Sequence, residues 1–196
     1  MILITTTRRP SRRTRSFVRD LYHVLPDAIR RNRGKMSLED LNELALQLGA
    51  DRVLVVGTSR GNPSSLAFYE PHPSAIRPIS VIHLRGVSLR REITDKRAPQ
   101  SRDLCITYSS PALAHPAQVF SLSFNVKEPI LASLRQLTQI EEYDLTLHLS
   151  PGPGGTINSS FFRIRPPWEV GPRMRIGGFR EYEGESRLES ESNLRE

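Results

Sequence analysis

Ten basic side chains lie within the first 35 residues of the 196-residue chain. The same segment holds two carboxylates, Asp20 and Asp27, so its net charge is +8, compared with +7 for the whole chain. The guanidinium group of arginine is a planar fork of donors that matches phosphate oxygens, so this concentration favours binding to a polyanion such as RNA. The candidate phosphate ligands are Arg8, Arg9, Arg12, Arg13, Arg15, Arg19, Arg30, Arg31, Arg33 and Lys35.

Three of these arginines are expected in the first turns of a helix. Phe17, Leu21 and Val24 recur at helical spacing after Ser11, and Pro26 ends the run. The helix dipole makes a cation at this end unfavourable by about 0.3–1 kcal/mol, which a bound anion would offset. Residues 12, 13 and 15 therefore favour a phosphate site, and the alternative is a solvated basic face without a ligand.

Other patterns that carry chemistry are missing from the sequence. Cys105 is the single cysteine, which excludes an internal disulfide and a cysteine-rich zinc site, and we expect it to be buried in a strand. The five histidines lack paired metal-ligand spacing, and there is no phosphate-binding P-loop or nucleophile elbow. We expect no catalytic residue, no metal, no cofactor and no small-molecule substrate. The aromatic pairs at 68–69 and 161–162 could stack on bases, but core packing is the simpler interpretation.

The composition is typical of a folded protein, with 37% hydrophobic and 25% charged residues and a sequence pI of about 10.2. No apolar run approaches the length of a membrane span. Arginines follow the short apolar start, which is the reverse of a signal peptide. The sequence therefore predicts an intracellular protein that does not enter a membrane.

Hydrophobic patterns in the first 70 residues predict the order β, α, β, α, β, β. A strand is expected at 2–6, then the basic helix, a short segment at 28–35, and a helix at 38–48. Ser37 is the expected N-cap of that helix, Asp40 completes a capping box, and Gly49 ends it. Strands at 52–56 and 64–70 are expected to form an antiparallel pair around a tight turn.

A proline-rich stretch at 71–78 is expected to connect two halves of the chain. Beyond it, strands are expected at 76–89, 103–109, 119–124, 144–149 and 157–165, with a helix at 127–140.

The second half has a pattern that resembles the first. The helix at 38–48 and the strands near Val53 and Leu66 match the helix at 130–140 and the strands near Leu145 and Phe161, at an offset of about 92 residues, which suggests a structural duplication. From residue 181 onward the chain has a net charge of −4 and no periodicity. This tail is expected to be disordered, and it is a candidate shield of the basic segment.

Three segments of the sequence resemble a known family. ILITTTRRPSRRTRSFVRDL, AIRRNRGKMSLEDLNELALQLGADRVLVV and RGNPSSLAFYE are similar to the first half of Brix domain proteins, in particular the archaeal members and the eukaryotic member of a small nucleolar ribonucleoprotein. The opening ITT-x-R-x-P-S-x-R together with N-R-G-K makes the resemblance specific over residues 1–70. The rest of the chain matches by pattern and length.

This resemblance implies an α/β (α+β) fold of two similar halves, each like the anticodon-binding domain of class IIa aminoacyl-tRNA synthetases. The Brix domain would cover residues 1–180, with halves at 1–72 and 73–180, followed by the acidic tail at 181–196. The implied function is binding of a ribosomal RNA precursor or guide RNA, as a chaperone or scaffold in small-subunit assembly, without catalysis. Location would be the archaeal cytoplasm, or the nucleolus in a eukaryote.

Two other functions remain open from the sequence. One is a protein-interaction scaffold whose basic face docks an acidic partner, such as another ribosome assembly protein. The other is an accessory domain that binds transfer RNA.

Overall fold

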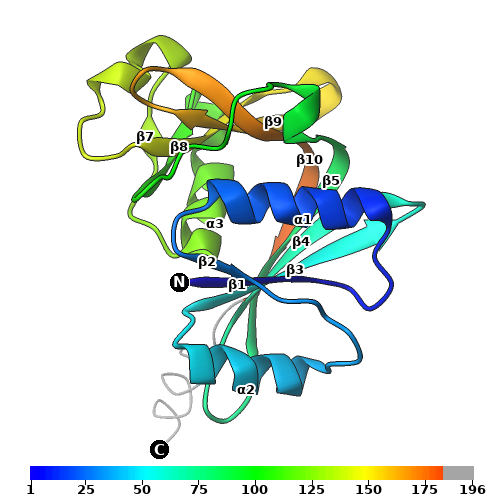
Figure 1. Ribbon diagram of the computed structural model, residues 1–196. Helices are drawn as coiled ribbons and strands as arrows, with labels where there is room; N and C mark the ends of the chain where they lie inside the picture. Colours follow the sequence, from blue (N-terminus) through cyan, green and yellow to red (C-terminus); the bar gives the residue numbers. More distant parts are fainter. Residues whose placement is uncertain (183–196) are drawn as a thin grey trace, which may run out of the picture.

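One ten-stranded sheet runs through the protein, whose computed structural model describes residues 1–182 (Figure 1). The strand order is β2-β1-β3-β4-β5-β10-β9-β8-β6-β7. The strands are β1 (Ile2–Thr6), β2 (Ala28–Arg30), β3 (Arg52–Ser59), β4 (Asn62–Glu70), β5 (Arg77–Ser88), β6 (Leu104–Tyr108), β7 (Ile130–Leu131), β8 (Leu145–Pro151), β9 (Ile157–Arg163) and β10 (Trp168–Glu181). The helices are α1 (Arg12–Val24), α2 (Leu38–Leu48) and α3 (Ala114–Phe124), with short 3₁₀ segments η1 (Arg90–Glu92), η2 (Pro111–Leu113), η3 (Leu134–Gln139) and η4 (Pro153–Gly155).

The topology repeats between the two halves. In the first half, β1 lies between two parallel neighbours, β2 and β3, and the chain continues as the antiparallel series β3-β4-β5. In the second half, β6 lies between parallel β7 and β8, followed by antiparallel β8-β9-β10. The halves join where β5 pairs antiparallel with β10. The predicted equivalence of the strands near Val53 and Leu145, and of those near Leu66 and Phe161, is therefore confirmed.

The two halves share one hydrophobic core on one face of the sheet. Phe17 and Leu21 of α1 belong to the same buried cluster as Phe120 and Phe124 of α3. The rings of Phe68 and Phe124 meet edge to face across the halves, with centroids 4.9 Å apart. Burial of these large side chains contributes most of the driving force for folding, so neither half closes its core alone.

Helix α2 covers the opposite face of β1 and β3, so α1 and α2 lie on opposite sides of these strands (Figure 1). Leu41 and Ala45 of α2 pack against Leu3 and Val53 in a second, smaller cluster. The capping box predicted at Ser37 and the left-handed terminator predicted at Gly49 are both confirmed.

Two predictions for the second half are wrong. Residues 119–124 belong to α3 rather than to a strand, because Phe120 and Phe124 are stacked at helical spacing and Ser123 donates to the carbonyl oxygen of Val119 at 2.6 Å. Residues 127–140 form β7 and η3 rather than one helix. The backbone of Ile130 pairs with that of Thr107 in β6, so it cannot continue a helix. A capping box formed by Ser133 and Gln136 then begins the 3₁₀ segment η3.

Two other features differ from the sequence expectations. The proline-rich stretch at 71–78 connects β4 to β5 within the first half of the repeat. Strand β10 was not predicted, because Gly171, Pro172, Gly177 and Gly178 interrupt its pattern, yet it pairs along its length with β9 and β5. Apart from Glu181, which ends β10, and Tyr182, the predicted acidic tail lies outside the described residues.

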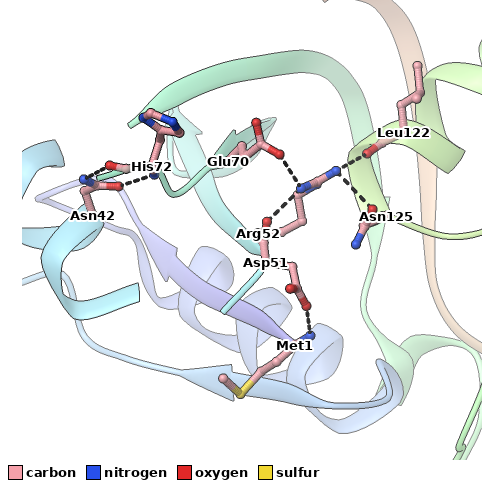
Figure 2. Close-up of polar contacts among 8 residues, drawn as sticks. All are labelled: Met1, Asn42, Asp51, Arg52, Glu70, His72, Leu122 and Asn125. Atoms are coloured by element: carbon pink, nitrogen blue, oxygen red, sulfur yellow. Dashed lines mark hydrogen bonds and ion pairs between the residues drawn. The ribbon is translucent and has the colours of Figure 1, made fainter. Parts of the chain in front are cut away.

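Arg52 joins the first half to the end of α3 (Figure 2). Its Nη2 donates to the carbonyl oxygen of Leu122 at 3.4 Å and to Oδ1 of Asn125 at 3.2 Å, and its Nη1 lies 3.5 Å from the carboxylate of Glu70. Burial lowers the pKa of Arg52, and its Nε has no partner among the described residues. In the same view, the amide of Asn42 holds the backbone of His72 through two hydrogen bonds, which ties α2 to the β4–β5 connection.

A polar layer lies in the second half of the sheet, on β6 and β8. Oγ1 of Thr107 contacts Oγ1 of Thr146 at 2.8 Å and Nδ1 of His148 at 2.9 Å, and all three residues are buried. Burial lowers the pKa of His148 from 6.5 to about 4. The imidazole is therefore neutral in the folded protein at neutral pH.

Replacement of Arg52 by Met should lower the free energy of unfolding by about 1–3 kcal/mol, because the acceptors on α3 lose their charged donor. Urea unfolding at neutral pH measures this change. Arg135→Met, at an exposed position of η3, is the matched control and should change stability little. Equal stability of Arg52→Met and the wild type would show that Arg52 does not join the halves.

The lowered pKa of His148 leads us to expect that the folded protein loses stability in weakly acidic solution. The imidazole of His148 binds a proton more strongly in the unfolded chain than in the folded protein. The free energy of unfolding is therefore unaffected by this group above pH 6.5, and it falls by about 1.4 kcal/mol per pH unit as the pH is lowered toward 4. Urea unfolding at a series of pH values measures the slope. His148→Gln should flatten it, and an unchanged slope in this variant would assign the pH dependence to another group.

Candidate nucleic-acid interface

The predicted basic residues gather at one edge of the sheet, at the carboxyl ends of β1 and β2. These strands are parallel, so the β1–α1 loop and the β2–α2 loop leave the sheet side by side. The first loop carries Arg8 and Arg9, and the second begins with Arg31. Ligands of open sheets with parallel strands commonly bind outside these carboxyl ends, so the edge is a suitable place for a site.

A hollow of about 240 Å³ lies between the two loops and the start of α1. Its lining contains five of the ten candidates and no carboxylate. The lining residues are Thr6, Arg8, Pro10, Arg15, Val18, Arg30, Arg31, Asn32, Arg33 and Gly34. The site therefore has a strong positive potential that is not neutralised by an acidic side chain in its wall.

Helix α1 presents its N-terminus beside this hollow. The side chain of Ser11 caps the helix by accepting from the backbone N–H of Thr14 at 3.0 Å, and the first turn contains no acidic residue. Nη1 of Arg15 donates to the carbonyl oxygen of Pro10 at 3.1 Å, which folds this side chain back over the loop. The positive end of the helix dipole and the guanidinium of Arg15 thus act on the same space.

Arg33 is the most buried of the ten candidates, with a relative exposure of 9%. Its Nε donates to the carbonyl oxygen of Met36 at 2.7 Å, which fixes the β2–α2 loop. Burial lowers the pKa of Arg33, and the like charge of Arg8 lowers it further. An anion in the hollow would relieve both the burial cost and the repulsion.

Arg13 is committed to a contact within the protein. Its guanidinium binds both carboxylate oxygens of Glu92 in η1, at 2.7 and 2.9 Å, and donates to the carbonyl oxygen of Val87 at 2.7 Å. The hydrogen bond with Glu92 raises the pKa of Arg13. Glu92 therefore offsets the charge of Arg13 within the protein, and the predicted contact of Arg13 with phosphate stays a prediction.

The remaining four candidates are exposed and do not line the hollow. Arg12 and Arg19 lie on α1, and Arg9 and Lys35 lie in the two loops. Neither these four residues nor Arg8, Arg15, Arg30 and Arg31 form an ion pair with a described residue. Their charges are available to a ligand.

The equivalent edge of the second half has a different chemistry. At the carboxyl ends of β6 and β7 the chain reads SSPALA at 109–114 and ASL at 132–134, without a charged residue. Leu131 and Leu134 are about half exposed there. The two halves therefore share their topology, whereas the arginine-lined hollow lies in the first half.

The structure also decides the minor candidates. Cys105 is buried in β6, as predicted, and burial raises the pKa of its thiol to about 11. Phe68 and Phe161 are fully buried in the core, and their neighbours Tyr69 and Phe162 are half-buried.

Among the described residues there is no cluster of His, Cys, Asp and Glu that could hold a metal ion. None of the helices in residues 1–182 is long and apolar enough to span a membrane.

The sequence could not predict two parts of this edge. Glu92 lies 79 residues from Arg13 in the chain, and no motif connects them. Thr6 and Asn32 also line the hollow, and no sequence motif indicates that they belong to it.

Comparison with known proteins identifies relatives of the chain. No family model matches the sequence. A probable Brix domain-containing ribosomal biogenesis protein of Thermococcus kodakarensis is 39% identical over 103 residues, which are 53% of this chain and 50% of the relative. The matched segment thus spans about half the length of this relative and of several similar ones. A protein of the same description from Methanopyrus kandleri is 35% identical over 181 residues, covering 90% of this chain and 93% of the relative.

Solved structures show the same fold. The crystal structure of a probable ribosomal biogenesis protein from Aeropyrum pernix has a TM-score of 0.73 and 32% identity, and the match covers 90% of this chain and 94% of that one. Mil, an archaeal Imp4-like protein, has a TM-score of 0.64 at 22% identity, and it supports the α+β fold alone. Because the match to the Methanopyrus kandleri relative extends over nearly the whole of both chains, this protein belongs to the Brix domain-containing ribosomal biogenesis proteins.

Proposed function

We propose that this protein binds RNA through the basic edge at β1 and β2, and acts as a non-catalytic chaperone or scaffold in ribosome biogenesis. The observation that carries the proposal is the hollow whose lining contains five arginines and no carboxylate. The guanidinium group of arginine binds phosphate oxygens through paired charge-assisted hydrogen bonds. Binding of a phosphate there would offset the repulsion between guanidinium groups such as those of Arg8 and Arg33.

The flanking residues favour a polymer over a small anion. Arg12 and Arg19 are seven residues apart on α1, which places them about 10 Å apart along the helix axis. Neither residue lines the hollow, so both are left for further phosphates of the same strand when one phosphate is bound there. We therefore assign the hollow and the exposed face of α1 to one RNA backbone.

The family supports a ribosomal RNA precursor, or a guide RNA that pairs with it, as the ligand. We assign the step to small-subunit processing and assembly, which is the finer part of the proposal. The likeness of each half to an anticodon-binding domain is still a prediction, so transfer RNA is the appropriate competitor in binding experiments. Other ribosome assembly proteins are candidate partners.

The proposed contacts can be tested by the salt dependence of RNA binding. Replacement of Arg8, Arg15 and Arg31 by Gln should reduce the slope of log affinity against log salt by about 2 to 3, since each phosphate contact contributes about 0.7 to 0.9. The probe is a labelled fragment of small-subunit ribosomal RNA that contains a hairpin. These three side chains are exposed, so the variant should unfold at the wild-type urea concentration.

The matched control removes the same charge elsewhere, by replacing the exposed residues Arg97, Arg102 and Arg135 with Gln. Its slope should stay close to that of the wild type. If the first variant folds and keeps the wild-type slope, the basic edge is not the RNA site.

The biological RNA can be identified by crosslinking in cells followed by sequencing of the attached RNA. Reads concentrated in small-subunit ribosomal RNA or its leader are expected. A majority of transfer RNA reads would contradict the assignment and favour a transfer-RNA-binding function, and recovery of protein partners without RNA would favour the scaffold for an acidic partner.

A further inference from the structure

The outer face of the central strands β5 and β10 is not covered by a described helix. Helices α1 and α3 occupy the other face, and α2 covers β1 and β3 at one side of the sheet. The side chains of His83 and Arg85 on β5, and of Arg175 and Arg180 on β10, are exposed. This open face lies in the middle of the sheet, where both strands already have paired neighbours.

Strand pairing brings the arginines of this face together. Arg175 is opposite Gly86 on β5 and opposite Asn158 on β9. A Cβ atom placed on Gly177 would lie 2.6 Å from Nε and 2.7 Å from Cγ of Arg85, so the side chain of Arg85 crosses onto β10 over this glycine. A larger residue at position 177 would displace the side chain of Arg85 from this place on β10.

A shallow hollow of about 260 Å³ lies on the same face. Its wall includes Arg173, Arg175, Asn158 and Ser88. Arg173 is held by the carboxylate of Glu169 at 2.9 and 2.7 Å, and Ser160 donates to the same carboxylate at 2.6 Å. That carboxylate is therefore engaged by Arg173 and Ser160, and Arg85 and Arg175 form no ion pair with a described residue.

The position of this face connects it with the basic edge. Strand β5 runs in the same direction as β1, because two antiparallel pairings lie between β3 and β5, so both carboxyl ends lie at the same edge. The two strands are three positions apart, which corresponds to about 14 Å. The hollow lies on the α1 side of the sheet, so an RNA strand that continues around this edge would reach the outer face at Gly86 and Ser88.

We infer that the outer face of β5 and β10 is a second contact for the sugar–phosphate backbone of the same RNA, bound through Arg85 and Arg175. This inference rests on the proposed RNA-binding function. The charge of the face fits a polyanion, and the small residues Gly86, Gly177 and Gly178 leave room for a backbone beside the arginines. A protein strand cannot add here, since β5 and β10 have no free edge.

Replacement of Arg85 and Arg175 by Gln tests the contact. With the same ribosomal RNA hairpin probe, the slope of log affinity against log salt should fall by about 1.5. Replacement of Arg97 and Arg102 by Gln removes the same charge and should leave the slope near the wild-type value. An equal fall in both variants, or an unchanged slope in the first, overturns the second contact.

A measurement on the unmodified protein gives an independent test. Phenylglyoxal reacts with accessible guanidinium groups, and the RNA probe should slow its reaction with Arg85 and Arg175 but not with Arg97 and Arg102. If RNA protects Arg8 and Arg15 and leaves Arg85 reactive, this inference is wrong while the proposed function stands. If the wild type binds the probe without a salt-dependent affinity and none of these arginines is protected, the proposed function itself fails.

Discussion

The antiparallel pairing of β5 with β10 is the contact on which the rest of the structure depends. It joins two five-stranded halves into one sheet, and thereby brings α1 and α3 onto the same face. The edge-to-face contact of Phe68 with Phe124, and the hydrogen bonds from Arg52 to the end of α3, exist because of this pairing. A small domain buries little apolar surface alone, and here both halves contribute to one core.

The two halves have the same topology but different side chains at the equivalent edge. The loops after β1 and β2 carry the arginines, while the loops after β6 and β7 contain no charged residue in the segments that occupy the equivalent positions. A repeated fold provides two similar edges, and substitution of exposed loop residues changes one edge without cost to the core. The second edge, with Leu131 and Leu134 exposed, thus differs from the first in the class of ligand that it suits.

Arginine has two separate uses in this protein. Arg13, Arg52 and Arg173 are structural, since each is held by a carboxylate and the first two also donate to backbone carbonyl oxygens. Arg15 and Arg175 carry charges that no described carboxylate neutralises. Total charge therefore overstates the binding surface, and only the contacts of each guanidinium separate the two groups.

The sequence by itself determined the local structure of the first half and the concentration of charge. Ser11 and Ser37 as caps and Gly49 as a terminator act over one helical turn, so their effect can be predicted from neighbouring residues. The segment at 127–140 and strand β10 were decided by partners distant in the chain, because backbone pairing there outweighs the local preference. The tertiary structure alone divided the basic residues: Glu92 neutralises Arg13 from 79 residues away, while the parallel pairing of β1 and β2 and the position of α1 bring five other arginines around one hollow.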